Sequence, residues 1–121
     1  MRIKISVAGD AIPAARPRFS GRRCYQPPSN VEYRERVQWS ARSAMRGADP
    51  LTGAISATIK LYPKYKTTAR RFGDVDNHLK ALFDGMNKIV FADDAQIIRC
   101  VVEKFTDKEN PRAEIEIQSV G

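Results

Sequence analysis

The chain has 121 residues, a formal net charge of +7 and 42% hydrophobic residues. This length is sufficient for one domain with a hydrophobic core, but not for two. No apolar run approaches the roughly 20 residues that a membrane span needs, and the alternating N-terminal residues lack the apolar segment of a signal peptide. The two cysteines, Cys24 and Cys100, make neither a disulfide framework nor a zinc motif. We therefore expect a cytoplasmic protein.

In chain order, the first half predicts a strand, a basic loop, a helix and a second strand. Apolar and polar residues alternate over 2–8, as in a strand. Residues 10–28 are rich in proline and arginine, so we expect a long, mobile basic loop there. Ser29 or Asn30 can cap a helix that runs to about residue 47. Residues 54–62 alternate again and predict a strand.

The second half predicts a helix followed by two strands. From Val75 onward, apolar residues recur at helical spacing. Residues 97–105 and 112–120 both have strand character, and the sequence DKENPR between them predicts a hairpin-like connection. The expected fold is a small mixed α/β domain covering residues 1–121. About four strands pack against two helices in the order β-α-β-α-β-β.

Charge is distributed unevenly along this chain. Residues 1–72 carry 15 basic and 4 acidic side chains, whereas residues 73–121 carry 6 and 10. Basic clusters favour polyanions, because each neutralised phosphate releases counterions. The alternative is a basic surface that is merely solvated, although this gives no reason for basic and acidic residues to be separated along the chain. The basic residues cluster in two segments, with Arg16, Arg18, Arg22 and Arg23 in the first and Lys60, Lys64, Lys66, Arg70 and Arg71 in the second.

Four aspartates stand in two short segments, GDVDNHLK at 73–80 and FADDAQ at 91–96. Asp74 and Asp76 are two residues apart, so in extended backbone both carboxylates lie on one side and can approach one hard cation. The alternative is that either residue simply caps the following helix with a side-chain oxygen.

The helix that follows carries a polar face beside these acids. Asp76, Lys80 and Asp84 recur every fourth residue and therefore share one face, where Asp76 and Lys80 could also form an ordinary ion pair. The chain must then turn back, which can bring Asp93 and Asp94 near the same place, unless these two residues only form a turn. Clustered carboxylates repel one another, and Mg²⁺ or Mn²⁺ is the cation that best suits such oxygen ligands. Lys80 could orient a water molecule or stabilise developing negative charge.

The aromatic residues and the single histidine give weaker indications. His78 is the only histidine, which excludes a two-histidine zinc or nuclease motif, and we expect it to be solvated. Trp39, Tyr33 and Phe19 could stack on bases, although the place of Trp39 within an amphipathic helix favours a core position.

The stretch GDVDNHLKALFDGMNKIVFADDAQI resembles the signature of the RusA family of Holliday junction resolvases, which are endodeoxyribonucleases of bacteria and their phages. The family pattern is D-x-D-N-x-x-K, a helix with a further Asp, and then D-D-x-Q. The matching residues here are Asp74, Asp76, Asn77, Lys80, Asp84, Asp93, Asp94 and Gln96. Many members carry P-P-S-N directly after the first strand, whereas PPSN stands at 27–30 here. This departure, with the RPR at 16–18, suggests a phage or prophage branch.

The resemblance implies cleavage of four-way DNA junctions by a Mg²⁺-dependent homodimer, with Mn²⁺ as a substitute and no organic cofactor or membrane. It implies a role in DNA recombination and repair near the bacterial nucleoid. The implied catalytic residues are Asp74, Asp76, Lys80 and Asp94; the three aspartates also bind the metal, and Asn77, Asp84 and Asp93 support them. Charge alone assigns DNA contacts to Arg16, Arg18, Arg22, Arg23, Lys64, Lys66, Arg70 and Arg71.

Dimerisation also follows from the chemistry of junctions. Two opposed strands must be cut, yet the chain offers one acidic cluster, and a two-fold dimer supplies the second. The proposed reaction is in-line attack of an activated water on a phosphodiester. Two rival functions stay open: a related Mg²⁺ nuclease acting on flaps or other branched DNA, and a non-catalytic nucleic-acid-binding protein with a structural acidic cluster.

Overall fold

The computed structural model describes residues 1–14, 18–20, 23–25, 28–65 and 74–120. The elements are β1 (Arg2–Ala8), β2 (Arg18–Ser20), β3 (Arg23–Tyr25), α1 (Pro28–Met45), β4 (Ile55–Tyr62), α2 (Val75–Met86), the 3-10 helix η2 (Asp94–Gln96), β5 (Ile97–Lys104) and β6 (Arg112–Ser119). The predicted mixed α/β class, the sheet of four strands and the two helices are confirmed. Within the described residues, no helix is both long and apolar enough to cross a membrane.

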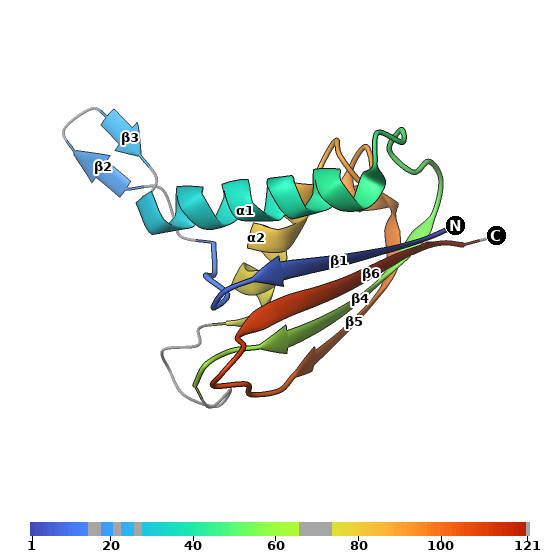
Figure 1. Ribbon diagram of the computed structural model, residues 1–121. Coiled ribbons are helices and arrows are strands. Elements are labelled where there is room, and N and C mark those ends of the chain that lie inside the picture. Colours follow the sequence, from blue (N-terminus) through green and yellow to red (C-terminus); the bar gives the residue numbers. More distant parts are fainter. Residues whose placement is uncertain (15–17, 21–22, 26–27, 66–73, 121) are drawn as a thin grey trace.

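The four strands lie in the order β1-β6-β4-β5, so the predicted hairpin of 97–105 with 112–120 is wrong. Strand β6 pairs antiparallel with both β1 and β4, whereas β5 runs parallel to β4 at the edge of the sheet (Figure 1). The physical reason is burial. Every second residue of β6 is buried, as suits a central strand, while every residue of β5 is at least partly exposed.

The segment 10–28, expected as a loop throughout, contains a small second sheet. Strands β2 and β3 pair antiparallel, with Arg18 opposite Tyr25 and Ser20 opposite Arg23. The expectation of a continuous loop is therefore wrong for these two strands, while Arg16 and Arg22 lie outside the described residues.

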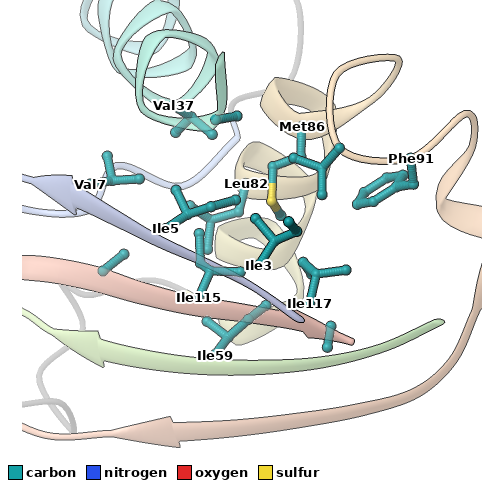
Figure 2. Close-up of a cluster of buried hydrophobic side chains, with 14 of the residues drawn as sticks. Ile3, Ile5, Val7, Val37, Ile59, Leu82, Met86, Phe91, Ile115 and Ile117 are labelled. Atoms are coloured by element: carbon teal, nitrogen blue, oxygen red, sulfur yellow. The ribbon is translucent and has the colours of Figure 1, made fainter. Parts of the chain in front are cut away.

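Both helices cover the same face of the four-stranded sheet, and the core fills the space between these layers (Figures 1 and 2). Helix α1 buries one residue per turn, namely Tyr33, Val37, Ala41 and Met45. Trp39 follows Val37 by two residues, or about 200° around the helix, and it is 71% exposed. The predicted core position of Trp39 is therefore wrong, and burial of Tyr33 excludes it from stacking on bases.

Gly85 sets how closely the two helices approach. A Cβ added there would lie 2.5 Å from Cγ1 of Val37 and 2.7 Å from its Cβ. The absence of a side chain at Gly85 therefore lets α1 and α2 pack in direct contact. This contact fixes α2, which carries most of the predicted site.

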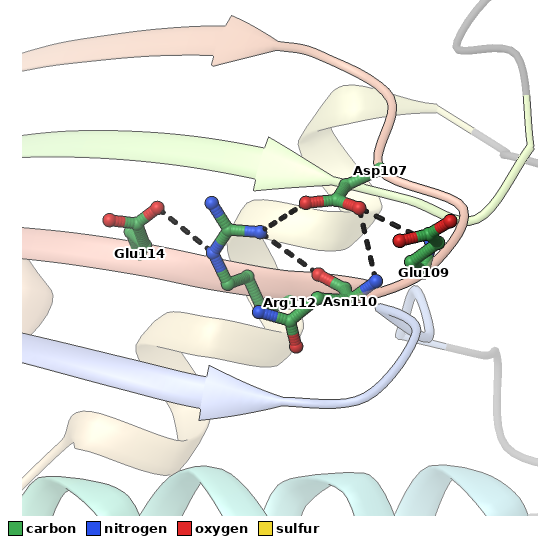
Figure 3. Close-up of polar contacts among 5 residues, drawn as sticks. All are labelled: Asp107, Glu109, Asn110, Arg112 and Glu114. Atoms are coloured by element: carbon green, nitrogen blue, oxygen red, sulfur yellow. Dashed lines mark hydrogen bonds and ion pairs between the residues drawn. The ribbon is translucent and has the colours of Figure 1, made fainter.

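The connection between β5 and β6 is held by one arginine (Figure 3). The Arg112 guanidinium lies 2.8 Å from Asp107 and 3.1 Å from Glu114, and it donates to the Asn110 carbonyl oxygen at 2.9 Å. It also lies 4.0 Å from the ring centroid of Tyr62. The Arg112 hydrogen bond and the backbone N–H groups of the loop hold the pKa of Asp107 below its usual range.

Candidate functional site

Helix α2 presents its first acid without using it as a cap. Asp74 is the N-cap residue in extended backbone, and its side chain makes no capping hydrogen bond. Instead, its main-chain oxygen accepts from the N–H groups of Asn77 at 3.1 Å and His78 at 3.3 Å. The alternative that Asp74 serves as a side-chain cap is therefore wrong, and its carboxylate projects into solvent.

The polar face of α2 carries Asp76, Lys80 and Asp84, all of them exposed. Lys80 pairs with Asp84 at 3.4 Å, rather than with Asp76 as the simple ion-pair alternative required. Asp76 lies in the first turn, where the positive end of the helix dipole favours a carboxylate. The face therefore presents an acid at each end and an ammonium group between them.

The second acidic segment is a rigid capped turn. The Asp93 side chain accepts a hydrogen bond from the Ala95 N–H at 2.9 Å and forms one half of a capping box for η2. The alternative that Asp93 is a turn residue is therefore confirmed. Asp94, the other residue of the pair, is the first residue of η2 and is exposed as well.

Gln96 completes this turn, and sequence reasoning gave it no role. Its Oε1 accepts from the N–H groups of Ala92 at 2.8 Å and Asp93 at 2.9 Å. Its Nε2 donates to the carbonyl oxygens of Leu51 at 3.0 Å and Gly53 at 2.9 Å. One side chain thus joins the acidic turn to the segment before β4. The spacing of Asp93 and Gln96 was the available signal, because a capping box uses positions three residues apart.

Electrostatics links this turn to helix α2. The pKa of Asp94 is raised, first by partial burial and then by Asp93 and the negative charge of Asp84, while Lys80 acts in the opposite direction. The pKa of Asp93 is lowered, mainly by the Ala95 N–H and then by a hydrogen bond with Asp94. Asp94 is therefore near enough to Lys80 and Asp84 on α2 for their charges to affect its titration. Asp76 lies one to two helical turns further toward the start of α2.

Whether these residues suit a divalent cation depends on their chemistry and their spacing. Among the described residues, no three acidic, histidine or cysteine side chains are close enough together to form a metal site. The donor set itself suits a hard cation, because Asp74, Asp76 and Asp94 are exposed carboxylates on adjoining elements. The pKa of Asp94 is raised first by partial burial, and repulsion from the carboxylates of Asp93 and Asp84 adds to this shift. A cation would relieve that repulsion.

His78 points into the core and not into solvent. It is 1% exposed and lies on the buried face of α2 with Ala81, Leu82 and Gly85. The expectation of a solvated histidine is therefore wrong. The helical spacing of these four residues was a sufficient signal, since they fall three, four and seven residues apart.

One main-chain hydrogen bond brings the segment after β1 to the start of α2, since the Ala14 N–H donates to the Asn77 main-chain oxygen at 2.9 Å. The segments after β1 and β4 are joined to each other, because the Lys64 N–H donates to the side chain of Asp10 at 3.0 Å. Lys64 is exposed in this region. Of the other basic candidates, Arg18 and Arg23 lie in β2 and β3, whereas those outside the described residues are Arg16, Arg22, Lys66, Arg70 and Arg71.

Comparison with known proteins gives two matches. A family model described as endodeoxyribonuclease RusA matches residues 8–118. The uncharacterized protein YqaN of Bacillus subtilis (strain 168) is 28% identical over 139 residues, an alignment that covers 98% of this chain and 97% of that protein. The family match runs from the last residue of β1 into β6, so it includes both acidic segments and the two helices.

Proposed function

Because the chain belongs to the RusA family of endodeoxyribonucleases, which are Holliday junction resolvases, we propose that it resolves four-way DNA junctions by paired symmetric nicks that depend on Mg²⁺. The observation that carries the proposal is the family match over residues 8–118, which includes both acidic segments. The pKa of Asp94, which is raised first by partial burial, also responds to Asp84 and Lys80 on α2, and this response supports one site built from both segments.

Asp74, Asp76 and Asp94 would hold the ion, and Mn²⁺ would substitute for Mg²⁺. When bound, such an ion neutralises charge on the phosphoryl group and lowers the pKa of a water molecule. Since the carboxylates of the described residues form no ready metal site, we expect the start of α2 and the acidic turn to draw together on binding. Asp93 and Gln96 limit the movement of the turn, and Asn77 holds the start of α2 to Ala14 through its main chain.

Lys80 is the catalytic lysine in this proposal. Its ammonium group lies between the acids, with Asp84 at 3.4 Å holding its position. There it can stabilise the negative charge that develops on the phosphodiester during in-line attack by water. Asp84 acts through Lys80 and is therefore a positioning residue.

The substrate would be held by phosphate contacts that carry no sequence information. The candidates remain Arg16, Arg18, Arg22, Arg23, Lys64, Lys66, Arg70 and Arg71. We also propose a homodimer, because two opposed strands must be cut and each chain supplies one acidic site. Its place would be the bacterial cytoplasm, close to the nucleoid.

The test uses a synthetic four-way junction, a flap, a duplex and single strands, each with Mg²⁺, Mn²⁺ or EDTA. We expect paired nicks on the junction with either metal, lost with EDTA and lost in Asp74→Asn with junction binding retained. Asp49→Asn is the matched control, because Asp49 is an exposed aspartate in the segment between α1 and β4.

The rival functions give different results in the same test. Preferential cutting of the flap would mean that the substrate is another branched DNA and not the four-way junction. Binding of the junction without cutting under either metal would contradict a catalytic role and favour a structural acidic cluster. Cutting by Asp74→Asn at the wild-type rate would remove Asp74 from the site.

A further inference from the structure

The outer edge of β5 is an unused hydrogen-bonding edge. The Phe105 N–H donates to the Leu61 oxygen at 2.8 Å, so the odd-numbered residues of this strand direct their main-chain groups toward β4. Because these groups alternate along a strand, those of Cys100 and Val102 point away from the sheet. In the part of the chain that the structure describes, β4 is the strand that pairs with β5, and the opposite edge of β5 meets no strand (Figure 1).

Among the described residues, this edge is neither interrupted by proline nor covered by another segment. Exposed sheet edges are commonly interrupted by proline or covered by another segment. From Arg99 to Lys104, β5 is regular and contains no proline, and its only register shift lies before Arg99. Large apolar side chains flank it at both ends, since Ile98 is 64% exposed and Phe105 is 40% exposed.

The charges on β5 are complementary to those of a second copy. Arg99, Val101 and Glu103 share the uncovered face of the sheet, next to Ser56, Thr58 and Lys60 in β4. When the two-fold axis is perpendicular to the sheet, the uncovered faces of both copies lie on the same side. Residues that stand directly opposite each other across the two strands therefore belong to the same face. With the axis at Val101, Arg99 stands opposite the partner's Glu103, and Glu103 opposite the partner's Arg99.

The competing register does not satisfy these charges. With the axis at Cys100, Arg99 would stand opposite the partner's Val101, and Glu103 would have no basic residue opposite it. Among the described residues, neither Arg99 nor Glu103 takes part in an ion pair within one chain. Opposite charges directly across an antiparallel pair stabilise it, whereas like charges there destabilise it.

We propose that two copies of the chain associate through antiparallel pairing of their β5 strands, with the two-fold axis at Val101. This inference names the surface of the homodimer in the proposed function and rests on it. Cys100 and the partner's Val102 exchange main-chain hydrogen bonds, as do Val102 and the partner's Cys100. The two sheets then form one continuous sheet across the dimer.

Pairing in this register also places the two candidate sites. The acidic turn η2 leads directly into β5, so antiparallel strands carry the two turns to opposite ends of the shared edge. At about 3.3 Å per residue, the two Ile97 residues lie about 26 Å apart along the strands. Two separated and symmetric sites suit a reaction that cuts two opposed DNA strands.

Exchange of the charges at Arg99 and Glu103, singly and together, tests the proposed dimer surface. The dimer Kd of each variant is measured by analytical ultracentrifugation over a range of protein concentrations. We expect the wild type to sediment as a dimer, and Arg99→Glu or Glu103→Arg to raise the dimer Kd about tenfold or more, because each places like charges opposite each other. The double variant Arg99→Glu/Glu103→Arg should restore the wild-type Kd. Unchanged Kd values in both single variants would overturn this surface, while a persistent dimer would leave the proposed homodimer intact.

Disulfide trapping tests the register independently. Val101→Cys, in a background of Cys24→Ser and Cys100→Ser, should cross-link under mild oxidant, because a non-hydrogen-bonded pair has a Cα separation of about 4.5 Å, within disulfide range. Ser6→Cys on β1, at the opposite edge, should stay monomeric in the same background. Cross-linking through Cys100 in Cys24→Ser without cross-linking through Val101→Cys would overturn the register. A monomeric wild type that still cuts junctions in pairs would overturn both the surface and the homodimer, but not the nuclease.

Discussion

Replacement of Gln96 by alanine removes the side-chain hydrogen bonds that hold the acidic turn to the segment before β4. Four hydrogen bonds are lost, two from Oε1 and two from Nε2. Each contributes about 0.5–1.5 kcal/mol net, and since most of them are near the surface, the total loss is about 2–3 kcal/mol. A domain of this size loses about 4 °C of Tm per kcal/mol. We therefore expect the Tm of Gln96→Ala to fall by about 8–12 °C.

Thermal unfolding followed by circular dichroism measures this change, without DNA or metal. Gln118→Ala is the matched control, because Gln118 is an exposed glutamine of β6, and its Tm should stay within about 2 °C of the wild type. At temperatures where Gln96→Ala is still folded, junction cleavage should also fall, since Asp94 loses its fixed backbone. A wild-type Tm in Gln96→Ala would refute the role of this side chain.

Three further predictions concern packing and titration. Gly85→Ala should lower the free energy of unfolding by about 1–2 kcal/mol in chemical denaturation, because overpacking against Val37 outweighs the better helix propensity of alanine; Val37→Ala should cost less in that variant than alone. Asp84→Asn should lower the pKa of Asp94, measured by NMR without metal, because Asp84 contributes to its upward shift. Asp107→Asn should reduce stability at neutral pH, since the depressed pKa of Asp107 contributes stability above the unfolded pKa of about 3.9. This difference should vanish as the pH falls through the folded pKa.

Each of these has a contradicting result. Additive losses in the Gly85 and Val37 cycle would mean that the two residues do not share a contact. An unchanged pKa of Asp94 in Asp84→Asn would show that the charge of Asp84 on α2 does not affect the acidic turn. A stability difference between wild type and Asp107→Asn that persists in strong acid would show that the Arg112 network does not depend on the charge of Asp107.

The alternating sequence predicted the strands well but not their pairing. Residues 2–8, 54–62 and 112–119 each alternate cleanly because one face of each strand is buried. Sequence proximity favoured a hairpin for the last two strands, yet β6 has the regular alternation of a central strand and β5 does not. Because one face of β6 must be buried, β6 takes a central place in the sheet, and β4 separates it from β5.

The two side-chain errors have one cause. Trp39 was placed in the core because it lies within an amphipathic helix, and His78 was expected in solvent, but in both cases the buried face of the helix was misidentified. Their positions on α1 and α2 decided otherwise, since Trp39 stands opposite the buried face and His78 lies within it. The spacing of Asp93 and Gln96 could have indicated the local role of Gln96, but its hydrogen bonds to the segment before β4 were hidden because those partners are distant in sequence. Sequence spacing located the acids, but only the fold shows that the charges of Lys80 and Asp84 affect Asp94.

The central claim is that the start of α2 and the turn at η2 bind one divalent ion together. Titration of the isotope-labelled protein with Mn²⁺, without DNA, tests it through paramagnetic broadening of amide signals. We expect the signals of residues 74–77 and 93–96 to broaden in parallel at the same Mn²⁺ concentrations, and both effects to be lost in Asp94→Asn. Broadening of one segment alone, or of both with unrelated affinities, would contradict a shared site.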